Sequence, residues 1–210
     1  MGKRIAVLVS GGGTNLQALI DAQNRGELGG GQIVAVISSK HGAYALERAE
    51  KAGIAGYVLP RKEFDSNRAM TVALVDMLKD LQIDLVVLAG CMIIFTEELV
   101  DAYPNAVMNV HPALIPSFCG AGYYGLRVHE EALRYGVKLT GATVHFVSEE
   151  CDGGPIIAQK AVEILDGDTP EILQRRVMEE AEWKLLPQAV SLFCQERLCV
   201  DGRIVTIKER

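Results

Sequence analysis

The chain has 210 residues, of which 49% are hydrophobic and 23% charged, and its formal net charge is −6. This balance is typical of a globular protein with one core, and the acidic charge argues against nucleic-acid partners and anionic membranes. The odd number of cysteines, five, and the absence of a C-x-x-C pair argue against a disulfide framework or a zinc ribbon, so we expect a reducing, cytoplasmic location.

The first half of the sequence alternates short apolar runs with segments of helical periodicity. The apolar runs expected as strands cover 5–9, 33–37, 57–59, 85–89 and 107–110. Helices are expected after residue 15 and over 43–52 and 67–79. This alternation predicts an α/β fold, with an open, mostly parallel, twisted sheet of Rossmann-like type and helices on both faces.

The second half has longer apolar segments and different turn chemistry. Residues 138–147 and 155–164 are expected as antiparallel strands. Thr169 and Pro170 suit the N-cap and first turn of a long helix that runs to about residue 195, in which Pro187 predicts a kink or a break. A small hairpin is expected at the end of the chain, around residues 201–202.

A glycine-rich loop, residues 10–15, joins the first strand to the first helix. Backbone N–H groups at such a helix start bind anions, and Thr14 and Asn15 add side-chain donors. The loop lacks the lysine of a nucleotide triphosphate loop, and Leu16 replaces the third glycine of the dinucleotide pattern. The pattern therefore favours a monophosphate site, with a tight turn that binds nothing as the alternative.

Two polar clusters follow later in the chain. Asn109 and His111 lie two residues apart at the end of an apolar strand, so both side chains point to one face and suit an oxyanion site for acyl transfer. The alternative is a buried core histidine beside an asparagine that forms a turn. Asp152 begins an Asp-Gly-Gly-Pro turn and would orient an imidazole, such as that of His145, if the two meet.

Five segments, in register, resemble the folate-dependent formyltransferase family. They read Ser-Gly-Gly-Gly-Thr-Asn-Leu-Gln from residue 10, Val-Leu-Ala-Gly-Cys-Met from 87, Asn-Val-His-Pro-Ala-Leu-Ile-Pro from 109, Gly-Ala-Thr-Val-His-Phe-Val from 141 and Asp-Gly-Gly-Pro from 152. The glycine loop narrows the resemblance to the branch that acts on a ribonucleotide amide, the glycinamide ribonucleotide transformylases.

The resemblance implies transfer of a formyl group from 10-formyltetrahydrofolate to the amine of glycinamide ribonucleotide. The products are formylglycinamide ribonucleotide and tetrahydrofolate, in de novo purine (IMP) biosynthesis. It implies no metal, no nucleic acid and no membrane as partners, and it leaves a homodimer open. It also implies a single domain over 1–210, in which 1–104 bind the nucleotide phosphate and 105–210 carry catalysis and bind the folate.

The resemblance further assigns roles to individual residues. Asn109 and a protonated His111 would donate hydrogen bonds to the formyl oxygen, and Asp152 would keep His111 charged and help to move a proton. The residues implied in acceptor binding are Gly12, Gly13, Thr14, Asn15 and Glu182. Those implied in folate binding are Arg68, Met92, Ile93, Ile94, Phe95, Asn109, Ser148, Glu149 and Cys151.

Some positions depart from the family pattern, and rival functions remain. Ile93 stands where many members have arginine, Asn67 stands beside Arg68 where an arginine is expected, and Trp183 stands where histidine is common. The rivals are a formyltetrahydrofolate hydrolase, a methionyl-tRNA formyltransferase and a non-catalytic nucleotide-binding module. The hydrolase usually carries an extra N-terminal domain, and the tRNA enzyme a C-terminal domain and a more basic surface.

Overall fold

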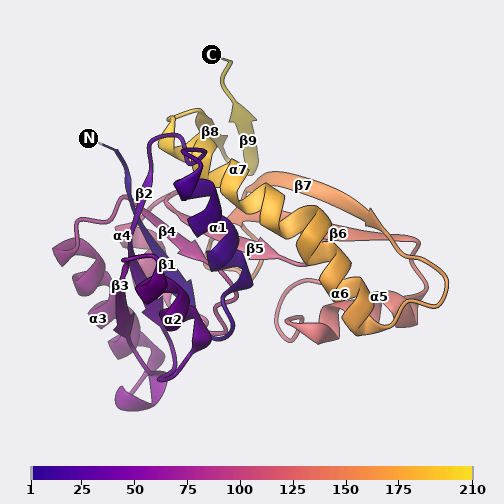
Figure 1. Cartoon of the computed structure of the whole chain (residues 1–210), viewed down its shortest axis with the longest axis horizontal. Coiled ribbons are helices and arrows are strands. Elements are labelled where there is room, and N and C mark those ends of the chain that lie inside the picture. Colours follow the sequence, from indigo (N-terminus) through magenta and orange to yellow (C-terminus); the bar gives the residue numbers. More distant parts are fainter. Residues whose placement is uncertain (1, 210) are drawn as a thin grey trace.

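The computed structural model describes residues 2–209, which form one nine-stranded sheet with helices on both faces (Figure 1). The strands are β1 (Arg4–Val9), β2 (Gln32–Ser38), β3 (Ala55–Val58), β4 (Leu85–Leu88), β5 (Val107–His111), β6 (Leu139–Phe146), β7 (Ile156–Glu163), β8 (Leu198–Asp201) and β9 (Ile204–Ile207). The helices are α1 (Thr14–Asn24), α2 (Tyr44–Lys51), η1 (Arg61–Glu63), α3 (Asn67–Asp80), α4 (Glu97–Ala102), α5 (Leu126–Tyr135), α6 (Pro170–Val177), η2 (Met178–Glu182) and α7 (Trp183–Cys194).

The order of the strands confirms the predicted α/β fold. The sheet runs β3-β2-β1-β4-β5-β6-β7-β9-β8. Strands β3, β2, β1, β4 and β5 pair in parallel, whereas β6 pairs antiparallel with both β5 and β7, as expected for the second half. All four residues of β4 are buried, because a parallel strand in the middle of such a sheet is covered on both faces.

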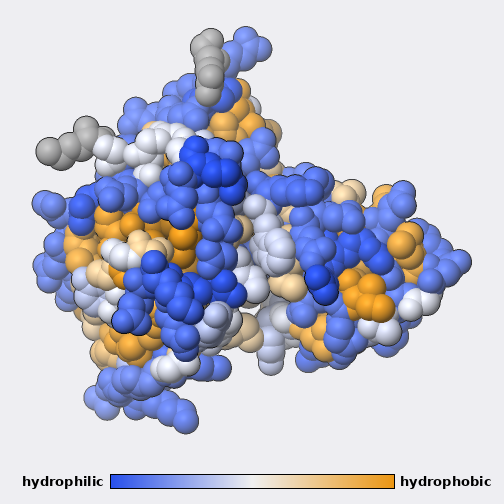
Figure 2. Space-filling model, viewed as in Figure 1, coloured by the Kyte–Doolittle hydropathy of each residue, from blue (hydrophilic) through white to orange (hydrophobic). Residues whose placement is uncertain are grey.

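Two layers of helices bury the two faces of the sheet. On one face, Leu16 and Leu19 of α1 share a buried cluster with Leu186 of α7 and Ala45 of α2. On the other face, α3 and α4 contribute Leu74 and Leu99 to a second buried cluster. Figure 2 shows hydrophilic residues over much of the face formed by α1, α2 and α7, with apolar residues in smaller patches between them.

The helix near the C-terminus begins as predicted but does not break at the proline. The Thr169 side chain accepts a hydrogen bond from the backbone N–H of Ile172, and Pro170 occupies the first turn. Of the kink or break predicted at Pro187, the break is wrong, since α7 continues through this residue to Cys194. The irregular turn lies upstream, where η2 is a π-helix. The sequence pattern does not predict α4 or α5.

The end of the chain forms the expected hairpin, in which β8 pairs antiparallel with β9. Strand β9 joins the main sheet through a parallel contact between Ile156 and Ile204. Residues on both sides of position 104 therefore share one sheet, and the division into a phosphate half and a folate half stays a prediction. Within residues 2–209, no helix is long and apolar enough to cross a membrane.

Candidate active site

The carboxyl end of β5 presents its polar side chains to a cavity of about 730 Å³. Asn109 and His111 both line this cavity, as their spacing of two residues along a strand predicts. The neighbouring strand β6 places His145 opposite Asn109 and Thr143 opposite His111. The antiparallel pairing of β5 and β6 therefore gathers an amide and two imidazoles at one point.

Thr143 fixes the chain that follows His111. Its hydroxyl donates to the carbonyl oxygen of Ala113 at 2.7 Å and accepts from the N–H of Ile115 at 3.1 Å. The amide of Gln159 reaches both the Thr143 hydroxyl and the Ile115 carbonyl oxygen, at 3.0 and 2.9 Å. These hydrogen bonds hold the loop after β5 in one conformation. The position of His111 is therefore fixed both by the strand that precedes it and by the loop that follows it.

The imidazole of His111 lies between a carbonyl and a carboxylate. Its Nε2 is 2.8 Å from the carbonyl oxygen of Phe118, so Nε2 carries a proton, and its Nδ1 is 3.5 Å from Oδ2 of Asp152. Burial lowers the pKa of His111, while the carboxylate of Asp152 and the Phe118 carbonyl act in the opposite direction. Asp152 therefore favours the charged ring, as expected, but burial outweighs it.

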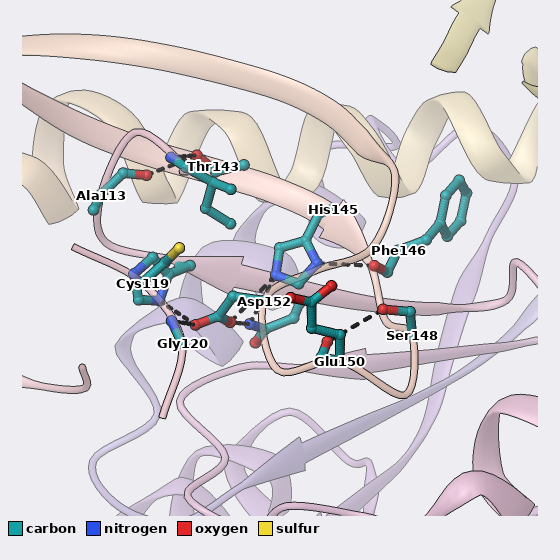
Figure 3. A network of polar contacts seen from close by, with 12 residues as sticks. Ala113, Cys119, Gly120, Thr143, His145, Phe146, Ser148, Glu150 and Asp152 are labelled. Carbon is teal, nitrogen blue, oxygen red and sulfur yellow. Dashed lines mark hydrogen bonds and ion pairs between the residues drawn. The ribbon is translucent and has the colours of Figure 1, made fainter. Parts of the chain in front are cut away.

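Asp152 is held by hydrogen bonds, as Figure 3 shows, and its backbone takes a left-handed conformation. Its φ of 55° lies in the left-handed region, which is uncommon for a residue other than glycine. Its Oδ2 accepts from the N–H of Gly120 at 2.9 Å. Burial raises the pKa of Asp152, but contacts with His145, His111 and Gly120 outweigh it and leave the pKa below its usual value.

Asn109 completes the cluster through its amide nitrogen. This Nδ2 lies 3.2 Å from Nε2 of His145 and 3.5 Å from Oδ1 of Asp152. Nδ1 of His145 lies 2.8 Å from the carbonyl oxygen of Phe146, so the ring is held in place from its other side. The trio expected from the sequence thus comes together, and His145 joins it.

The residues expected to bind folate line the same cavity. They are Arg68, Met92, Ile93, Ile94, Phe95, Ser148, Glu149 and Cys151, together with Asn109. Met92 and Ile94 are 51% and 64% exposed, so this wall presents apolar surface to a ligand. Of the two neighbours Asn67 and Arg68, Arg68 lines the cavity, where it forms an ion pair with Glu98. Asn67 instead accepts a hydrogen bond from Arg61.

The residues expected to bind the acceptor form a separate cluster, outside the lining of this cavity. The amide of Asn15 donates to Oε2 of Glu182 at 2.7 Å, and both side chains are buried. Burial raises the pKa of Glu182 to about 7, although the hydrogen bond from Asn15 lowers it. Thr14 contacts the sulfur of Met178, while Gly12 and Gly13 form the exposed turn before α1.

Ser10 connects the acceptor cluster to the cavity. Its hydroxyl lies 2.7 Å from the Ser39 hydroxyl and accepts from the backbone N–H of Met92 at 2.8 Å. One side chain from the glycine loop therefore holds a wall of the expected folate pocket. No local pattern predicts this contact, because the two residues are 82 positions apart in the chain.

Sequence reasoning also missed part of the cavity. The loop between β5 and α5 contributes Gly120, Tyr123 and Tyr124, and the ring of Phe118 packs against Tyr123 and Tyr135. The run of glycines and aromatic residues was the only available signal. Among residues 2–209, no group of three or more His, Cys, Asp or Glu side chains is arranged to hold a metal ion.

Comparison with known proteins gives consistent matches. The family described as Formyl transferase matches residues 3–190. A phosphoribosylglycinamide formyltransferase from Haemophilus influenzae is 41% identical, with 93% of this chain and 89% of that protein covered. A chloroplastic phosphoribosylglycinamide formyltransferase from Arabidopsis thaliana is 39% identical, and the match covers 93% of this chain and 67% of that protein.

A solved structure agrees with the sequence relatives. Glycinamide ribonucleotide transformylase 1 from Symbiobacterium toebii superposes with a TM-score of 0.93 at 42% identity, and 99% of this chain and 95% of that chain are covered. The chain is also 42% identical to the trifunctional purine biosynthetic protein adenosine-3 of Bos taurus, with 98% of this chain and 20% of that protein covered.

Proposed function

The chain belongs to the formyl transferase family, with glycinamide ribonucleotide transformylase activity in de novo purine biosynthesis, and we propose that Asn109, His111 and Asp152 carry out its reaction. The family uses a formyl folate as donor, and we propose 10-formyltetrahydrofolate as the form used here. The observation that carries the proposal is the meeting of these three side chains, from β5 and the loop after β6, at the wall of one large cavity.

Two N–H groups are placed to stabilise the oxygen of the formyl group as the amine attacks its carbon. Nε2 of His111 already serves a carbonyl oxygen, that of Phe118, at 2.8 Å, and the formyl oxygen would replace it there. The side-chain nitrogen of Asn109 lies 3.2 Å from His145 and 3.5 Å from Asp152. The longer contact is the one that the formyl oxygen would replace. Donors fixed in this way lower the barrier because negative charge grows on that oxygen.

Asp152 supports the charged state of His111 and receives the proton that the amine loses. Its carboxylate lies 3.5 Å from Nδ1 of His111, and its lowered pKa keeps it ionised at neutral pH. The negative charge of Asp152 favours the protonated imidazole, which donates a stronger hydrogen bond to the formyl oxygen as negative charge grows there. A proton that leaves the amine therefore has a base close to the reacting carbon, from which it can pass to the folate nitrogen.

The two substrates would enter from different sides of this trio. The apolar wall formed by residues 92–95 suits a flat pterin ring, with backbone groups to orient it. The glycine loop and Glu182 would hold the phosphate and the sugar-amide of the acceptor, and Ser10 links the two regions. A cytoplasmic location and a homodimer stay predictions, and the two plant relatives are chloroplastic proteins.

The proposal is tested by comparing His111→Asn with His41→Asn. His41 is a matched control because its side chain is 73% exposed and its ion pair with Glu63 lies outside the cavity lining. We expect His111→Asn to lower kcat by about 10²–10³ while both Michaelis constants change little, since an oxyanion donor is lost. A kcat for His111→Asn close to that of the control would remove His111 from the mechanism.

A further inference from the structure

We propose that Arg48 of α2 is a positioning residue for the phosphate of the acceptor, because it aims the N–H groups of the glycine loop. This inference rests on the proposed function, which places that phosphate at the loop. In the structure α2 lies beside the start of α1 (Figure 1), and the loop touches α2 closely enough that a Cβ on Gly13 would stand 2.7 Å from the Cβ of Ala45.

Helix α2 holds two consecutive carbonyl groups of the loop. The backbone N–H of Ala45 donates to the carbonyl oxygen of Gly11 at 3.2 Å. The Nε–H of Arg48 donates to the carbonyl oxygen of Gly12 at 2.8 Å. Both peptide bonds are trans and planar, so the N–H of each following residue points the opposite way. The N–H groups of Gly12 and Gly13 therefore point away from α2.

These N–H groups are free to bind an anion. Within residues 2–209 neither the Gly12 nor the Gly13 N–H has a hydrogen-bond acceptor, and both residues retain surface exposure. Gly13 caps α1 with a φ of 72° and without a side-chain cap, and the first turn of α1 contains no acidic residue. Successive N–H groups in this conformation, ahead of a helix, form a concave anion site.

Arg48 is itself held in place by neighbouring side chains. Its Nη1 donates to the Gln17 side chain at 2.8 Å, and its guanidinium stacks on the Tyr44 ring at 4.9 Å from the centroid. In the part of the chain that the structure describes, no carboxylate forms an ion pair with Arg48. The guanidinium thus adds an unneutralised charge behind the loop, which lacks a lysine of its own.

Lys51 offers a matched control for the test. It lies on the same helix and over the same Tyr44 ring, at 5.5 Å from the centroid, but it makes no hydrogen bond to the glycine loop. We expect Arg48→Gln to raise the Michaelis constant for glycinamide ribonucleotide by about 10- to 100-fold, with kcat and the folate Michaelis constant within about twofold of wild type. Lys51→Gln should change none of the three by more than about twofold.

A phosphate-free acceptor separates this role from a general effect on the fold. With glycinamide riboside, Arg48→Gln and wild type should have the same Michaelis constant for the acceptor, because the aimed N–H groups have no phosphate to bind. Arg48→Lys keeps the charge but loses the planar donor group, so it should give a smaller rise with the nucleotide. This variant also serves if Arg48→Gln fails to fold.

The outcomes are distinct. A phosphate-dependent rise in Arg48→Gln, or in Arg48→Lys if the former does not fold, supports the proposal. An equal rise with the riboside, an equal rise in Lys51→Gln, or no rise at all overturns it. Wild-type protein that fails to turn over formyl folate and glycinamide ribonucleotide would instead overturn the proposed function.

Discussion

Replacing Asp152 with Asn is expected to remove most of the turnover while leaving the fold intact. The carboxylate accepts from the N–H of Gly120 at 2.9 Å through Oδ2, and its Oδ1 lies 3.6 Å from Nε2 of His145. An asparagine has the same shape and can keep its oxygen toward Gly120, whereas its NH₂ loses only the long contact from Nδ2 of Asn109, at 3.5 Å. The short hydrogen bond therefore survives, and the main loss is the negative charge beside His111.

The size of the effect follows from the contact between Asp152 and His111. A full charge pair at their separation of 3.5 Å attracts by about 5 kcal/mol at an effective dielectric constant of about 20. Only the part of this energy that favours the protonated, better-donating imidazole contributes to catalysis. Because burial lowers the pKa of His111, the ring depends on the carboxylate of Asp152 to favour that form. We therefore expect kcat to fall by about 10²–10³, similar to the loss of one oxyanion-site donor.

The assay is steady-state formyl transfer over a range of pH, with Asp166→Asn as the matched control, since that side chain is fully exposed. Asp152→Asn also removes a group that raises the pKa of His111. As pH rises, the remaining activity should therefore begin to fall at a lower pH than in wild type. A variant with kcat within about tenfold of the control, or with an unshifted pH profile, would refute the role assigned to the carboxylate.

Three further predictions follow from neighbouring contacts. Ser10→Ala removes the acceptor of the part-buried N–H of Met92, so denaturant unfolding should show a loss of about 0.5–1.5 kcal/mol and the folate Michaelis constant should rise. Unchanged values would remove the link. Gly13→Ala puts a Cβ 2.7 Å from that of Ala45, at a φ of 72°. The free energy of unfolding should therefore fall by about 1–3 kcal/mol and the acceptor Michaelis constant should rise. No change in either quantity would contradict the close packing of the loop against α2. Burial raises the pKa of Glu182 from 4.5 to about 7, so the wild-type protein should lose stability as pH rises through this range. In denaturant unfolding, Glu182→Gln should therefore be more stable than wild type by about 3 kcal/mol at pH 8 but not at pH 4. An equal pH dependence of the two proteins would argue against a buried carboxyl.

The part of the fold that depends on local pattern was predictable from the sequence. Uniformly apolar runs such as residues 85–89 indicated strands covered on both faces, and Thr169 with Pro170 marked a helix start through their own backbone chemistry. The effect of Pro187 was not predictable in the same way. Its missing N–H breaks one hydrogen bond, but the buried contacts of Leu185 and Leu186 with α1 keep the helix continuous.

The catalytic trio was predictable only in part. The spacing of Asn109 and His111 gave their common face, because side chains alternate along a strand. Their meeting with Asp152 depends on how the loop after β6 folds back to Gly120, which no local pattern encodes. The same holds for His145, whose place opposite Asn109 is set by the antiparallel register of β5 and β6.

Contacts between distant segments were beyond the reach of the sequence. Ser10 and Arg48 both appeared as ordinary polar residues, one at the end of a strand and the other on an exposed helix. Their roles come from the parallel order of β2, β1 and β4, which brings α2 and residue 92 to the same edge as the glycine loop.

The most direct test of the account is to follow consumption of 10-formyltetrahydrofolate by the wild-type protein with and without glycinamide ribonucleotide. We predict that consumption requires the acceptor and that one formylglycinamide ribonucleotide forms for each tetrahydrofolate released. Equal consumption without the acceptor, with formate as the product, would show a hydrolase. No consumption in either case would contradict the claim that Asn109, His111 and Asp152 form a formyl-transfer site.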